Sequence, residues 1–185
     1  MNTVPIAAVL DFEVYLLVTM KYGMLNRESV LEAKLAEHNL SFADAERTHR
    51  RIAELLSDEA TQFESLRALL GATCQEAQLL GFSGILWPDF DFIAHTSASG
   101  TIQSAGYRRA RGQAVVAESP TEQPPWSMDV SEFIQHFGPT TVQYQSGLFD
   151  KTLPAHTGHE FDWSGRAYGA GFSWGLFLFA SLMWT

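Results

Sequence analysis

Cysteine is almost missing from this chain of 185 residues, in which Cys74 is the single example. One cysteine cannot form an internal disulfide, and it cannot build a zinc cluster that depends on cysteine ligands. A domain of this length buries roughly 70% of its unfolded surface, so it needs neither device for stability. The lack of cysteine pairs fits a reducing compartment, and the sequence therefore predicts a cytoplasmic protein.

Positive charge is also scarce, with 12 Lys and Arg against 21 Asp and Glu and a formal net charge of −9 at pH 7. The electrostatic field of a negatively charged protein repels the phosphates of nucleic acids and attracts basic surfaces. The same charge is also a common means of keeping a protein soluble. We therefore expect a protein partner, of basic character, and no nucleic acid.

Two largely apolar stretches of the sequence raise the question of a signal peptide or a membrane segment. The stretch Val4–Met20 follows no Lys or Arg and is interrupted by Asp11 and Glu13, so it does not have the pattern of a signal peptide. Residues 167–184 contain no charged side chain. The length of this uncharged segment is close to the minimum for a membrane span. Glycine and serine within this run favour a buried strand over a membrane anchor. We predict a central strand over Phe172–Trp184, with a terminal helix as the alternative.

The residues before Gly81 have the periodicity of helices. Apolar side chains recur every three or four positions in four segments, which are predicted to span about 6–23, 26–39, 41–56 and 57–80. Asn26 is a predicted N-cap, and Ser41 with Asp44 forms a predicted capping box. The fourth helix is predicted to open at Ser57, bend at Gly71 and continue to Leu80. Short connections between these helices favour antiparallel or crossed neighbours.

The residues after Gly81 are richer in glycine, aromatic and β-branched side chains, which indicates strands. The predicted elements are a strand over Gly84–Phe92, pairing of Thr101–Tyr107 with Gln113–Ala117, an exposed loop over Glu118–Pro125, a helix over Val130–Phe137 capped by Asp129, and hairpins at Ser146-Gly147 and Ser164-Gly165. The whole chain, 1–185, is thus predicted to be one α+β domain. A bundle of about four antiparallel helices (1–81) packs on an antiparallel, β-rich part (82–185).

One cluster of residues could hold a metal. His156 and His159, followed by Glu160 and Asp162, offer nitrogen and oxygen ligands of the kind that zinc, iron or manganese accepts. Pro154 and a nearby glycine indicate a flexible polar loop here, which is the competing interpretation. We expect no cofactor, and keep a divalent metal on His156, His159 and Asp162 as the alternative.

Two further clusters suggest a binding surface. Asp89 and Asp91 alternate with phenylalanines, as in an amphipathic edge strand, and paired carboxylates could also act as an acid–base pair or bind a cation. The second cluster is the only dense basic patch of the sequence, Arg108, Arg109 and Arg111. It could bind carboxylates bidentately, or it could be the solvated tip of a hairpin. The residues predicted to contact a partner are Asp89, Asp91, Tyr107, Arg108, Arg109 and Arg111.

The helical part also has a family resemblance. A short apolar helix, Asn26-Arg27-Glu28 opening the next one, His38-Asn39-Leu40-Ser41 as a connector and then a long Arg/Glu helix follow one another over residues 9–70. This order is similar to that of small bacterial proteins encoded near type VI secretion and polymorphic-toxin systems, which are often immunity or accessory proteins. The resemblance implies binding to a toxin or secretion component. We therefore expect a non-enzymatic immunity or adaptor protein, with a metal-dependent enzyme as the alternative.

Overall fold

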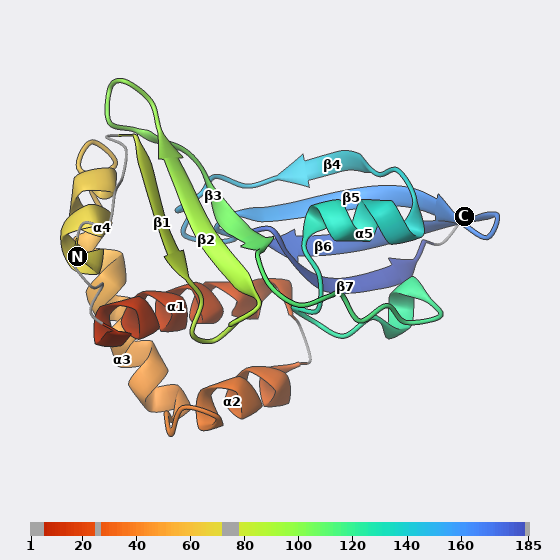
Figure 1. Ribbon diagram of the computed structural model, residues 1–185, viewed down its shortest axis with the longest axis horizontal. Helices are drawn as coiled ribbons and strands as arrows, with labels where there is room; N and C mark the ends of the chain where they lie inside the picture. The colour runs from red at the N-terminus through yellow and green to blue at the C-terminus, as the bar shows by residue number, and fades with distance from the viewer. Residues whose placement is uncertain (1–5, 25–26, 72–77, 184–185) are drawn as a thin grey trace.

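The computed structural model describes residues 6–24, 27–71 and 78–183. Four helices come first: α1 (Ile6–Met20), α2 (Glu28–Ala36), α3 (Phe42–Leu55) and α4 (Gln62–Leu70). A three-stranded antiparallel sheet follows, made of β1 (Leu79–Ser83), β2 (Phe90–Thr96) and β3 (Ile102–Arg109) in that order. After α5 (Val130–Phe137), a second antiparallel sheet contains β4 (Thr141–Gln145), β5 (His156–Trp163), β6 (Arg166–Ser173) and β7 (Leu176–Leu182). The predicted α+β class is confirmed (Figure 1).

Helix α1 forms the centre of the larger hydrophobic core. Its side chains from Phe12 to Met20 are buried on every side, which is typical of a helix that neighbours enclose completely. The ring of Phe12 packs edge-on against Phe82 of β1 and Phe92 of β2, with centroids 6.0 and 5.3 Å apart. Helix α3 packs across the opposite side of α1 (Figure 1). The first sheet and the helices therefore share one core.

Two predicted helix caps are confirmed. Ser41 accepts a hydrogen bond from the Asp44 N–H, and the Asp44 carboxylate accepts one from the Ser41 N–H, so α3 begins with a complete capping box. Helix α5 begins at the predicted residue with an equivalent box between Asp129 and Glu132. Both motifs are closed within four residues of sequence, so a local pattern is enough to predict them.

The ends of two other helices differ from the prediction. Helix α4 begins at Gln62 instead of Ser57, and it ends at Gly71, whose φ of 70° places it in the left-handed region that terminates helices. Leu80 belongs to β1, so the predicted continuation of α4 to Leu80 is wrong. The predicted cap Asn26 lies outside the described residues, and Arg27 occupies the N-cap position of α2 without a side-chain cap.

One predicted strand and two predicted strand pairings also differ from the structure. Residues 84–89 form a turn between β1 and β2 rather than a strand. Residues 113–117 do not pair with β3, because the Gln123 side chain bonds the Val115 carbonyl and the Ala117 N–H and holds this segment as a loop. Likewise 148–153 is no strand, since Asp150 accepts the N–H groups of Thr152 and Leu153. The actual partners are β2 for β3 and β5 for β4.

The predicted central strand over Phe172–Trp184 is instead the end of β6, a turn and the edge strand β7. Trp174 and Gly175 form the turn, with φ values of 50° and 78°. Trp174 is fully buried, and its indole N–H donates to the Thr19 hydroxyl of α1 at 2.9 Å. The Trp174 carbonyl accepts the Tyr107 N–H of β3 at 2.7 Å. This turn therefore joins the second sheet to both α1 and the first sheet.

A smaller core lies between α5 and one face of the second sheet. Phe133 of α5 packs on the rings of Phe161, Phe172 and Phe177, with centroids 5.1 to 5.3 Å apart. The hairpin predicted at Ser164-Gly165 is confirmed and links β5 to β6. Within 6–24, 27–71 and 78–183, no helix combines the length and apolar character that a bilayer crossing needs.

Candidate functional site

The predicted arginine patch and the predicted aspartate cluster meet in the structure. Arg109 is 11% exposed and forms an ion pair with Glu132 of α5, and its guanidinium also donates to the Ser127 carbonyl at 2.7 Å. The same side chain lies 3.5 Å from the Asp89 carboxylate and 4.4 Å from the centroid of the Phe90 ring. Arg109 thus holds β3 to α5, and this structural role occupies most of its donors.

Arg111 and Asp91 form a second pair. The Arg111 guanidinium bonds the Asp91 carboxylate at 2.7 Å and the carbonyls of Pro88 and Phe90 at 2.8 and 3.2 Å. Strand β2 lies between β1 and β3, so the interpretation of Asp91 as part of an edge strand is wrong. Asp89 and Asp91 each face an arginine rather than one another.

Tyr107 is buried and does not form part of the surface. Its hydroxyl donates to Glu13 Oε1 at 2.8 Å, while Glu13 Oε2 accepts the N–H groups of Ile85 and Leu86, also at 2.8 Å. Burial raises the pKa of Glu13 above its ordinary value, although these three hydrogen bonds oppose the shift. Burial and the nearby Glu13 carboxylate raise the pKa of Tyr107. These two residues connect α1, the β1–β2 turn and β3.

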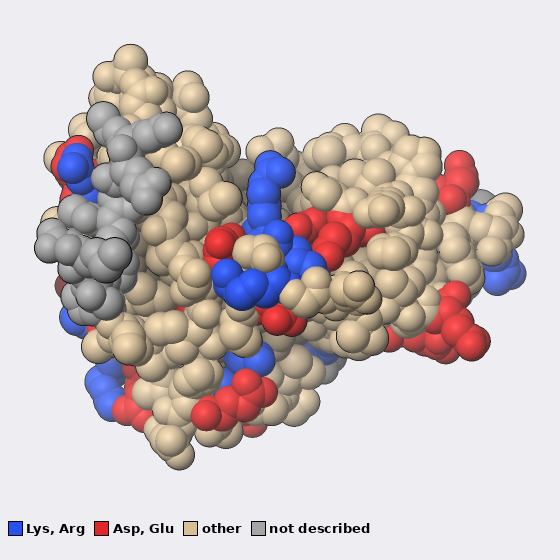
Figure 2. Space-filling model, in the orientation of Figure 1, with Lys and Arg blue, Asp and Glu red and all other residues tan. Residues whose placement is uncertain are grey.

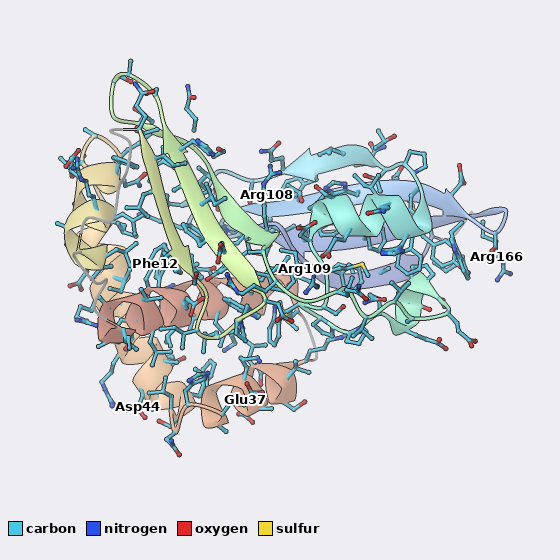
Figure 3. All side chains as sticks on the ribbon, in the orientation of Figure 1. Phe12, Glu37, Asp44, Arg108, Arg109 and Arg166 are labelled. Atoms are coloured by element: carbon cyan, nitrogen blue, oxygen red, sulfur yellow. The ribbon has the colours of Figure 1, made fainter. Side chains whose placement is uncertain are left out.

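Arg108 differs from its neighbours. It is exposed, and its side chain makes no hydrogen bond or ion pair with another residue of the described part of the chain. Arg108 and Arg109 extend to opposite sides of β3, since successive side chains of a strand alternate (Figure 3). Figure 2 shows basic side chains flanked by acidic ones at the junction of the two sheets. Arg108 is therefore the member of the predicted patch with a free guanidinium.

The two histidines lie on β5, so the predicted flexible loop is wrong. Residues three apart on a strand point to opposite faces, which separates His156 from His159. Asp162 and Glu160 share the face of His156, and His156 itself lies against Gly23. The structure thus does not bring His156, His159 and Asp162 together. Among the described residues, no group of three or more metal-binding side chains is assembled.

His159 is nearly buried and bonded through both ring nitrogens. Nδ1 lies 2.8 Å from the Thr140 hydroxyl, and Nε2 lies 3.1 Å from the Thr157 hydroxyl. Burial lowers the pKa of His159, and the positive charge of His156 lowers it further. The ring packs on Phe172 at 4.8 Å between centroids. His159 is therefore held in place by both hydroxyls, with its imidazole at the base of a cleft.

That cleft, of about 810 Å³, lies between the two sheets and is here called the intersheet cleft. Strand β3 and the turn before it, from Thr101 to Ala105, form one wall. The second sheet contributes the floor through Val142, Thr157 and His159, beyond the end of α5. The surface is hollowed between the two sheets (Figure 2). The remaining lining comes from the loop 145–150, from Ala155, from Gly175 and Val130, and from Ser57, Glu59 and Gln62.

The lining of the intersheet cleft has one sign of charge. Among the described residues that line it, Glu59 and Asp150 are the only charged ones, and most of the others are Ser, Thr, Gln or small apolar residues. An adjoining hollow of about 190 Å³ shares Ala105 and Gly175 with the cleft and contains Arg108. A ligand lying along β3 would therefore meet carboxylates within the cleft, and Arg108 together with the Asp129 carboxylate beyond it.

Of the residues singled out from the sequence, His159 alone lines the intersheet cleft. The other lining residues could not be recognised from the sequence, because the cleft is built from a strand edge and a loop, and neither needs a distinctive residue type. No protein family, curated protein or solved structure matches this chain.

Proposed function

We propose that this chain is a non-enzymatic binding protein, of the adaptor or immunity type, that holds an extended basic segment of a partner protein in the intersheet cleft. The observation that supports the proposal is the lining of that cleft, in which Glu59 and Asp150 are the only charged groups within the part of the chain that the structure describes. Because both carry negative charge, the cleft favours a segment that contains Lys or Arg.

The neutral part of the lining suits a peptide. Hydroxyl and amide groups of Gln103, Ser104 and Thr157 can bond the polar backbone of a bound segment. Val142, Leu148 and Phe149 offer apolar contacts for its side chains. The net charge of −9 also increases the rate at which a basic partner approaches.

Two adjacent residues of β4 allow a matched test. Val142 pairs with His159 and faces the cleft, whereas Thr141 pairs with Glu160 and faces the other side of the sheet. Both are exposed, so each tolerates a long side chain. A V142R variant places a cation in the cleft, and T141R adds the same charge elsewhere.

The probe is a displayed library of random 12-residue peptides, selected against the full chain. We expect enrichment of peptides rich in Lys or Arg whose affinity falls as salt rises. The V142R variant should weaken the selected peptides at least tenfold, and T141R should change their affinity by less than about threefold. No enrichment, or equal effects of V142R and T141R, would overturn the proposal.

A further inference from the structure

We infer that the bound segment is held as an added strand on the outer edge of β3, with its backbone bonded to Ala105. This inference rests on the proposed function and specifies how the segment binds. Strand addition to a sheet edge is a general mode of peptide recognition, because main-chain hydrogen bonds supply affinity for many sequences.

The hydrogen bonds of β3 show which of its amides face outward. In an antiparallel pair, alternate residues bond the neighbouring strand and the others point away from it. Two outward amides are already used: the Arg109 N–H donates to Asp129 at 2.9 Å, and the Tyr107 N–H donates to the Trp174 carbonyl at 2.7 Å. By the same alternation, the next outward amide and carbonyl belong to Ala105.

Ala105 opens into the intersheet cleft. Its N–H has no hydrogen-bond acceptor among the residues in the described ranges. Four consecutive residues of β3, from Ile102 to Ala105, line the cleft, which fits an open strand edge that ends in a register irregularity at Gln103. Gly175 lies where the Trp174 turn ends and the open part of the edge begins.

The other candidate edge, that of β4, is less suited to pairing. A bulge at Gln143 shifts the register between Val142 and Tyr144, so these residues pair with His159 and Gly158 and lie on opposite faces. Bulges of this kind interrupt the hydrogen-bonding pattern of an edge and protect it from added strands. Strand β3 has a comparable irregularity at Gln103, but Ala105 lies on its regular side, which extends from Ser104 to Arg109, so the ladder around Ala105 is continuous.

The charge of the cleft restricts the occupant to a basic peptide segment. Glu59 is exposed and has no ion pair with another described residue, so its carboxylate is free to meet a Lys or Arg of the segment. Asp150 is engaged with the backbone of its own loop, and Glu59 is therefore the better position for a charge test.

The first test changes only the peptide. A peptide from the 12-residue library is synthesised with a single N-methyl group at each backbone amide in turn, and each version is titrated against the full chain by calorimetry. Because alternate amides of an added strand face β3, we expect a tenfold or larger loss of affinity at one or two positions, with little effect at their neighbours. If the parent peptide binds and every methylated version stays within threefold, binding is real and strand addition is wrong. If no peptide binds, the proposed function itself fails.

The second test changes the protein. An A105P variant removes an N–H that β2 does not use, so the ladder between β2 and β3 stays intact. We expect A105P to weaken the peptide at least tenfold, while A105S, which keeps the N–H, binds within threefold of the original chain. Circular dichroism and melting temperature report whether A105P is folded, and the N-methyl series decides the question if it is not. Equal binding by folded A105P would overturn the inference.

A charge exchange tests the basic character of the segment. The E59K variant should weaken a Lys-containing peptide about fivefold or more, and replacing one peptide Lys by Glu should restore the affinity for E59K. Glu54 is likewise exposed but lies on α3 outside the cleft, so E54K is the matched control and should have no effect. Identical losses in E59K and E54K would show that only the overall charge matters, which would overturn a segment seated beside Glu59.

Discussion

Replacing Glu13 by alanine should destabilise the protein strongly, because its carboxylate accepts three hydrogen bonds inside the core. The donors are the Ile85 N–H, the Leu86 N–H and the Tyr107 hydroxyl, each 2.8 Å away. Leaving one buried donor without a partner costs about 1–3 kcal/mol. For the three donors together we therefore expect E13A to lose about 3–9 kcal/mol, which is a large part of the ~5–15 kcal/mol that stabilises a domain.

The glutamine variant separates hydrogen bonding from charge. In E13Q the amide oxygen can accept the N–H groups of Ile85 and Leu86, and the amide nitrogen can donate to the Tyr107 hydroxyl, which is able to accept. All three contacts are then kept without a buried negative charge. The unfolding free energy of E13Q at low pH should therefore lie within about 1 kcal/mol of the original.

The effect of Glu13 on stability should depend on pH. Burial is the largest cause that raises its pKa above the ordinary value of 4.5, so the folded chain holds this proton more tightly than the unfolded chain. The stability that this proton contributes is complete below pH 4.5 and is lost as the pH rises through the folded-state pKa. E13Q cannot lose a proton there, and its stability relative to the original chain should increase over the same range.

Urea unfolding followed by tryptophan fluorescence measures both effects between pH 4.5 and 8. Tyr107→Phe serves as a control that removes a single donor and should cost less than E13A. A loss below about 1 kcal/mol in E13A would refute the assignment of Glu13 as the acceptor for three core donors. A pH-independent difference between E13Q and the original chain would refute the raised pKa.

Two further predictions concern the second sheet. Alanine at Gly171 would place its Cβ about 2.5 Å from the Phe179 ring. G171A should therefore lower the free energy of unfolding in urea by about 1–3 kcal/mol. The same substitution should cost less when it is made in an F179A background, where the ring is absent. The imidazole of His159 should titrate below 6.5 in NMR, so the stability linked to its neutral form is present above pH 6.5 and lost as the pH falls through the lowered pKa. His156→Gln should move that midpoint upward, because His156 contributes to the shift; a midpoint at or above 6.5 in the original chain contradicts the burial argument.

Local motifs were predictable from the sequence because they close over a few residues. The Ser41–Asp44 box and the helix that begins after Asp129 need only a side chain and the backbone three positions away. Strand pairing was not predictable in the same way. Residues 113–117 have the composition of a strand, but the side chain of Gln123 bonds the Val115 carbonyl and the Ala117 N–H, and composition and periodicity do not indicate such a contact.

The candidate site shows the same limit. The aspartates near residue 90 and the arginines near residue 110 were recognised as two separate clusters, yet the register of β2 and β3 makes them one set of ion pairs. The intersheet cleft exists because the Trp174 turn reaches β3, a contact between residues that are far apart in the chain. Periodicity and composition describe single elements and do not specify such a contact.

The position of α1 has a consequence for the order of folding during synthesis. Helix α1 is made before either sheet, but Glu13 meets Tyr107 only after 94 further residues, and Thr19 meets Trp174 only after 155. Until then, an almost entirely apolar helix lacks most of the surface that encloses it, and such segments are prone to aggregate or to recruit chaperones. Synthesis of the β6–β7 hairpin is therefore the event that completes the enclosure of α1 and commits the nascent chain to its native state.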